Sequence, residues 1–144
     1  MARFAFEEET WATLEFMPFA LRYRLDRAGV KLPLAAWQKL PHDERVALCE
    51  HPVESPEQRD ALRARCLAHG ERTGAPAKSV EPSPEPPLWR SYDTFERVRA
   101  RLGHLMRVRW EALADEQAYV LWRLADPTKD EARFTAAARE FRLA

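Results

Sequence analysis

Two cysteines and two histidines have the spacing closest to a metal site in this 144-residue sequence. They form a Cys-x-His pair, Cys49 and His51, and a Cys-x-x-His pair, Cys66 and His69. Two Cys and two His are a common ligand set for structural zinc, and the pairs fall on successive predicted helices. Neither pair has the Cys-x-x-Cys knuckle, and both cysteines lie on apolar stripes, where a free thiol behaves as a small buried hydrophobe. We therefore expect no metal and no cofactor, with zinc binding as the alternative.

The other residues that could do chemistry form no known catalytic motif. The sequence has no Gly-x-Ser-x-Gly elbow, no phosphate-binding glycine loop and no His-Glu-x-x-His pair. His42 and His104 fall in predicted turns, which favours a solvated role over a catalytic one. The run Glu7-Glu8-Glu9 fits a helix N-terminus, where negative charge is favourable. We therefore expect a protein that is not an enzyme and has no catalytic residue.

Charge is unevenly placed along a chain whose formal net charge is zero. The segment from Trp89 to Trp110 holds six arginines and two acids, whereas the segment from Pro41 to Asp60 holds six acids and two arginines. An arginine cluster suits a helix-turn-helix DNA-binding protein, but Arg97 and Arg101 share a helix face from which Arg99 points away. We expect the two segments to face each other or solvent, and a docking patch for a partner protein is the functional alternative.

Composition is typical of a folded helical protein. Hydrophobic residues make up 46% of the chain and aromatic residues 10%, with five tryptophans, which is enough for a core. The 23 basic residues balance 23 acidic ones, so the basic excess of proteins that bind nucleic acid or anionic membranes is missing. Neither a signal peptide nor a membrane helix of about 20 apolar residues is expected. These features predict a soluble, cytoplasmic protein with reduced cysteines.

Helix signals dominate the sequence, and prolines often stand where a helix begins. In the first half, helices are predicted over 18–28, 34–40, 41–51 and 56–69. Gly29 is expected to end the first of these, and Ser55-Pro56-Glu57-Gln58 is typical of a capping box at the start of the last. That last helix should end at about His69, with Gly70 or Gly74 beyond it. In the second half, helices are predicted over 94–102, around Trp110, over 115–124, and over a last segment with Phe134, Ala137, Ala138 and Phe141 at helical spacing. Asp93 is expected to cap the first of them.

A proline-rich segment separates the two helical halves. Residues 75–88 hold five prolines among small and charged residues, which is typical of an extended, polyproline-like connector. We expect a plain strap, with a ligand for an SH3-type module as the alternative. Strand signals are weak. The predicted organisation is a first helical unit over 1–74, a connector over 75–88 and a second helical unit over 89–144, packed as one domain.

The two halves share an order of helix, glycine, tryptophan, leucine and further helix. The first copy runs through Gly29, Trp37, Leu40, Glu44 and Leu48, and the second through Gly103, Trp110, Leu113, Gln117 and Leu121. Two copies make a weak repeat, which predicts a pseudo-symmetric pair of helical units. Trp37 and Trp110 are therefore expected to anchor the core. Trp11, Trp89 and Trp122 have no match, and one of them, exposed beside arginines, would be a candidate contact for a partner.

The block Met17 to Leu32, which reads MPFALRYRLDRAGVKL, is the most specific part of a pattern that runs over nearly the whole chain. Further matching positions are Phe6-Glu7, Trp37, Leu40, Glu44-Arg45, Pro52, Ser55-Pro56-Glu57, Thr73-Gly74, Pro86 to Trp89, Trp110, Leu113, Gln117 and Glu140 to Leu143. The sequence thereby resembles the nitrate reductase-associated protein family. It departs from the family's cyanobacterial branch between Leu124 and Phe134, where that branch has a His-Glu-Asn run. The resemblance implies support of assimilatory nitrate reductase, without a known catalytic residue.

These observations together predict an all-α protein of two pseudo-repeated helical units. The predicted function is a non-enzymatic accessory or assembly and maturation factor that supports a cytoplasmic assimilatory nitrate reductase through protein contacts. The alternative is a small helical DNA-binding regulator that uses the segment Arg97 to Arg109, and an enzyme or metal protein built on the Cys and His pairs is a weaker third. The candidate partner-binding residues are Arg22, Arg24, Asp26, Lys31, Trp89, Arg97 and Arg101.

Overall fold

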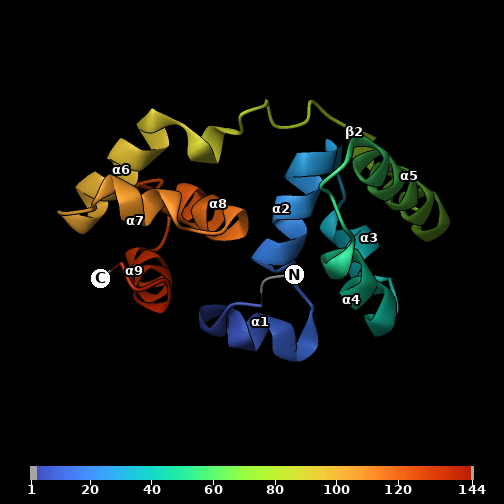
Figure 1. The fold of residues 1–144 in the computed structure, drawn as a ribbon. Coiled ribbons are helices and arrows are strands. Elements are labelled where there is room, and N and C mark those ends of the chain that lie inside the picture. Colours follow the sequence, from blue (N-terminus) through green and yellow to red (C-terminus); the bar gives the residue numbers. More distant parts are fainter. Residues whose placement is uncertain (1–2, 144) are drawn as a thin grey trace. The chain divides into compact units, whose positions relative to one another are not determined.

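A computed structural model describes residues 3–143 of the chain and contains helices with one short two-stranded sheet (Figure 1). This confirms the predicted all-α class. The chain divides into two compact units: unit 1 holds Arg3 and residues 7–83, and unit 2 holds residues 4–6 and 84–143. No helix within the described range is both long enough and apolar enough to cross a membrane.

Unit 1 contains five α-helices among its described residues. They are α1 (Glu8–Thr13), α2 (Phe19–Ala28), α3 (Leu34–Gln38), α4 (His42–Glu50) and α5 (Pro56–Thr73). A 3-10 helix, η1 (Ala5–Glu7), precedes α1 in the chain, and its first two residues belong to unit 2. Helix α2 follows Pro18, ends at Gly29 with φ 74°, and packs against α4 and α5. Its side chains are buried on most of its circumference. This helix, which lies within the family-like block, is therefore the central element of unit 1.

Trp37 and Arg45 fix the beginning of unit 1 to α3 and α4. The Trp37 indole Nε1 donates to the carbonyl oxygen of Leu14 at 2.9 Å, and Arg45 Nη1 donates to the same oxygen at 3.0 Å. Leu14 ends α1 with φ 53°, in the left-handed region. Two donors thus satisfy a carbonyl at a helix end that would otherwise lack a partner. Trp37 is fully buried, as expected of a core anchor.

Residues 75–83, the first part of the predicted connector, pack on unit 1 as a strap. Strand β2 (Lys78–Ser79) pairs antiparallel with β1 (Val30–Lys31), a pairing that the weak strand signals did not predict. Ser83 donates from its backbone N and its Oγ to the carbonyl oxygen of Asp26, at 3.1 and 2.9 Å. Hydrogen bonds from β2 and from Ser83 therefore hold the strap to the region of α2 and β1.

Two glycines of unit 1 are needed where the strap passes. A Cβ on Gly29 would lie 2.7 Å from the oxygen of Val80, and a Cβ on Gly70 would lie 2.4 Å from the nitrogen of Ala77. Helix α5 continues through Gly70 and ends before Gly74, which has φ 76°. The helix therefore runs past the predicted end near His69. Gly74, one of the two glycines expected beyond it, is the C-terminal cap, whereas Gly70 lies inside the helix and gives the strap room.

Unit 2 contains four α-helices in the part that the structure describes. They are α6 (Tyr92–Leu102), α7 (Arg107–Glu111), α8 (Asp115–Leu124) and α9 (Glu131–Glu140), and the 3-10 helix η2 (Leu88–Arg90) precedes them. Helix α8 packs against α9 and η2, with Tyr119 and Leu121 buried. Ser91 caps α6, since its Oγ accepts from the backbone N of Thr94 at 3.2 Å. Asp93 as the cap was a wrong prediction, because the hydroxyl two residues earlier takes this role.

Candidate functional site

The four residues of the predicted zinc alternative do not form a metal site. Cys49 and Cys66 are both buried, and His51 Nδ1 lies 2.9 Å from the carbonyl oxygen of Pro52. Within residues 3–143, no three His, Cys, Asp or Glu side chains lie close enough together to hold a metal ion. Burial raises the pKa of the Cys66 thiol to about 12, against a smaller opposing effect of the Arg65 charge. Cys66 therefore stays protonated at neutral pH, as a thiol in apolar surroundings does.

His69, the fourth of these residues, belongs to a polar cluster between α4 and α5. Glu44 Oε1 accepts from Arg65 Nε at 2.8 Å and from His69 Nε2 at 2.9 Å, and Arg72 Nη2 donates to His69 Nδ1. This arrangement puts the proton of His69 on Nε2, because Nδ1 accepts. Burial raises the pKa of Glu44, but the hydrogen bonds from Arg65 and His69 outweigh it and hold the pKa below its usual range. The cluster joins the two helices.

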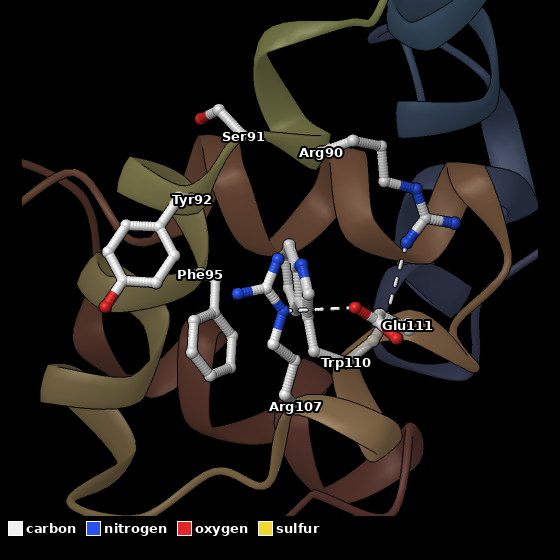
Figure 2. A pocket seen from close by; sticks show the side chains of 7 residues that line it. All are labelled: Arg90, Ser91, Tyr92, Phe95, Arg107, Trp110 and Glu111. Carbon is white, nitrogen blue, oxygen red and sulfur yellow. Dashed lines mark hydrogen bonds and ion pairs between the residues drawn. The ribbon is translucent and has the colours of Figure 1, made fainter.

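Unit 2 has a pocket of about 350 Å³ between the start of α6 and α7. Its lining residues, drawn in Figure 2, are Arg90, Ser91, Tyr92, Phe95, Arg107, Trp110 and Glu111. The Arg107 guanidinium lies 5.5 Å from the ring centroid of Tyr92 and 5.7 Å from that of Phe95. Its Nε donates to Glu111 Oε1 at 3.0 Å. Arg107 is thus held over two aromatic rings by cation–π attraction and an ion pair.

Arg90 forms a fixed wall of this pocket. Its Nε donates to Asp115 Oδ1 at 3.1 Å, and its Nη2 donates to the carbonyl oxygen of Leu113 at 2.6 Å. The Trp89 indole also donates to Asp115 Oδ1, at 2.9 Å, and Trp110 is buried. These bonds join η2 to the loop between α7 and α8. Arg90 and Trp110 therefore shape the pocket, whereas Tyr92 and Arg107 lie at its exposed rim.

Large apolar side chains are exposed around α7. Tyr92 is 58% exposed, Met106 55% and Val108 62%, and Arg107 lies between the last two in the chain. We call these four residues the α7 surface. A further hollow of about 310 Å³ includes Met106, Arg109 and Leu143. Exposed apolar side chains beside hollows are typical of sites that contact another protein.

A third hollow, of about 190 Å³, combines one aromatic ring with several charges. It is lined by Arg97, Trp122, Arg123, Asp126 and Lys129, and we call it the basic hollow. The Arg123 guanidinium lies 5.9 Å from the ring centroid of Trp122, which is half-buried. The expectation of an unmatched tryptophan beside arginines thus has a structural counterpart at Trp122.

The structure separates the seven predicted partner-binding residues into buried and accessible ones. Arg24 and Trp89 are buried, and Arg24 donates to the carbonyl oxygens of Ala20 and His51. Arg22, Lys31 and Arg97 are exposed. Asp26 and Arg101 are half-buried. Arg24 and Trp89 are therefore not accessible to a partner, because their side chains form hydrogen bonds inside the units. The spacing of residues in the sequence does not reveal this role.

The arginines between Arg97 and Arg109 are largely engaged by their own unit. Arg99 donates to Glu96, Arg107 to Glu111, and Arg109 to the carbonyl oxygen of Arg142. Arg101 donates to the carbonyl oxygen of Ala125 at 3.1 Å and lies 4.9 Å from the ring centroid of Phe134. A DNA-binding face needs several arginines that project together toward phosphates. These contacts give no support to the alternative of a DNA-binding regulator.

Sequence signals for the remaining surface residues differ in strength. Trp122 was marked by its lack of a matching position in the predicted repeat. Arg123 and Lys129 carried no signal, because a single arginine or lysine is an ordinary surface residue. Met106 and Val108 were also missed, since the short helix around Trp110 has no regular apolar stripe from which exposure can be judged.

The described residues define a protein of the all-α class with aromatic and charged hollows at its surface. The model of the family described as conserved nitrate reductase-associated protein matches residues 3–141, so the chain belongs to this family. The family membership that the sequence predicts is thereby confirmed. No curated protein and no solved structure matches the chain significantly.

Proposed function

We propose that the chain is a non-enzymatic accessory or maturation factor that supports a cytoplasmic assimilatory nitrate reductase through protein contacts. The observation that carries the proposal is the family match over residues 3–141, because the family is described by its association with nitrate reductase. The family match covers both units, so both units belong to the region that the family shares.

The α7 surface supports a role in protein contact. Val108 and Met106 expose most of their side chains beside Arg107, and exposed apolar area of this kind gains free energy when a partner covers it. Arg107 adds a planar guanidinium already held by Tyr92 and Phe95, so little side-chain freedom is lost on binding. We propose this surface as a contact with the reductase, and Arg22 and Lys31 as accessible candidates in unit 1.

Deletion of the gene tests whether the chain supports the reductase. Cells without the chain are expected to grow slowly on nitrate but normally on ammonium, and to contain less active reductase per unit of reductase protein. Complementation with the intact gene should restore activity. A Val108→Ser variant should restore it only partly, whereas Val80→Ser, which changes an exposed valine in unit 1, should restore it fully. Normal reductase activity in the deletion strain would contradict the proposal.

A further inference from the structure

The basic hollow is built around a tryptophan that is held rigidly from within. The ring centroid of Trp122 lies 5.7 Å from that of Trp89 and 5.7 Å from that of Tyr119. Trp89 and Tyr119 are both buried. A tryptophan fixed on one side and accessible on the other loses little conformational freedom when a partner covers it. Trp122 therefore has the properties of a preformed contact residue.

Positive charge exceeds negative charge around this ring. The lining side chains are positive at Arg97, Arg123 and Lys129 and negative at Asp126. Asp126 Oδ1 accepts from the backbone N and the Oγ1 of Thr128, at 2.9 and 2.8 Å. These bonds, with the charges of Lys129 and Arg97, hold the pKa of Asp126 below its usual range. Even with this carboxylate ionised, the lining keeps an excess of positive charge.

We propose that the basic hollow binds an acidic segment of the protein partner, with carboxylates against Arg97 and Lys129 and an apolar side chain over Trp122. This inference rests on the proposed function, because it names the chemistry of the segment that the partner presents. Complementary charge steers association and selects the partner, while the covered aromatic ring supplies affinity.

Size and surroundings favour a peptide over nucleic acid as the occupant. The hollow measures about 190 Å³, which suits one or two side chains. DNA binding needs several phosphate contacts along an extended face, yet Arg99 and Arg101 are directed to Glu96 and to the carbonyl oxygen of Ala125. The hollow is therefore an isolated basic site with an aromatic ring, which matches a short acidic segment.

Fluorescence anisotropy with a labelled peptide of Glu and Asp residues around one Phe tests the site on the full chain. Arg97→Gln combined with Lys129→Gln should weaken binding about tenfold, because two cations that pair with carboxylates are lost. Lys78→Gln combined with Arg139→Gln removes the same charge from exposed positions elsewhere and should change affinity less than twofold. Trp122→Phe, which keeps a ring, should weaken binding several-fold, and a Lys and Arg peptide should not bind.

The outcomes separate this inference from the proposed function. Equal losses in the two double variants would overturn the inference, because binding would then follow net charge alone. Tighter binding of a duplex DNA probe, lost in the Arg97 and Lys129 variant, would also overturn it. Undiminished capture of nitrate reductase by that variant would refute the inference and leave the proposed function standing. Peptide binding without any capture of reductase would refute the proposed function and leave the acidic-peptide site standing.

Discussion

In each unit a helix ends at a glycine and a five-residue helix follows, but the surroundings of the two glycines differ. In unit 1 a helix, α2, is followed by Gly29 and the five-residue helix α3; in unit 2 α6 is followed by Gly103 and the five-residue helix α7. Both glycines have positive φ, 74° and 79°. A Cβ on Gly29 would meet the strap at 2.7 Å, whereas one on Gly103 would meet no described atom within 4 Å. The strap thus covers this position in unit 1, and the glycine of unit 2 has open space at its Cβ position.

An arginine holds the end of the tryptophan-bearing helix in each unit. Arg45 Nε donates to the carbonyl oxygen of Leu40 at 3.0 Å, and Arg90 Nη2 donates to that of Leu113 at 2.6 Å. The two leucines are matching positions of the predicted repeat, although the arginines come from different places in the sequence. The repeat stays a prediction. The units differ in that the strap packs against Gly29 in unit 1, whereas unit 2 exposes large apolar side chains around α7.

The largest expected effect is a difference in stability between alanine variants of the two glycines. Gly29→Ala should lower the free energy of unfolding by about 3 kcal/mol, since it combines a left-handed backbone with displacement of the strap backbone at Val80. Gly103→Ala should cost about 1 kcal/mol, because the backbone conformation is its main penalty. Urea denaturation followed by circular dichroism measures both. Equal losses would show that the strap does not press on Gly29.

The two arginines give the next largest effect. Arg45→Met and Arg90→Met should each destabilise the protein by about 2 kcal/mol, because methionine fills much of the space but leaves carbonyl oxygens without their donor. Arg45 donates hydrogen bonds to the carbonyl oxygens of Leu14, Gln38 and Leu40. Arg90 also forms an ion pair with Asp115. Thermal unfolding at matched pH compares them. Loss in one variant alone would mean that the shared contact at the leucine is not what stabilises each unit.

The smallest expected effect concerns two glutamates with lowered pKa. The Glu44 carboxylate stabilises the folded state above its usual titration range, and this contribution is lost as the pH falls through its folded-state pKa. Glu44→Gln should cost about 1 kcal/mol at pH 7 and progressively less below about pH 4. Glu96, whose pKa is lowered mainly by its hydrogen bond from Arg99, is a matched control on the surface. Glu96→Gln should have the smaller effect, and a loss for Glu44→Gln that does not depend on pH would contradict this account.

Local signals in the sequence predicted the helices well where a cap or a proline acts alone. Pro18 and Gly29 bound α2, residues 115–124 form α8, and Ser55 and Gln58 form the predicted capping box. Prediction was poorer where contacts between distant segments determine the local structure. Gly70 lies inside α5, where a Cβ would meet the strap, and β2 forms because it pairs with β1, far away in the sequence.

The candidate sites were predictable only in part for the same reason. The unmatched Trp122 and the exposed Arg97 were recognisable from the sequence, but their place in one hollow depends on how α6 and α8 pack. Arginine and tryptophan are common at contact sites, yet Arg24 and Trp89 donate their hydrogen bonds to carbonyl and carboxylate oxygens inside the units. Residue type alone does not distinguish a buried donor from a surface contact.

The central claim, that this chain acts by contacting nitrate reductase, is tested most directly by affinity purification of the tagged chain from nitrate-grown cells. We predict that the reductase co-purifies with the intact chain and with the Val80→Ser variant. The Val108→Ser variant, which changes the α7 surface of unit 2, should capture several-fold less reductase. Circular dichroism of each variant controls for folding. Absence of reductase from the eluate of the intact, folded chain would contradict the account.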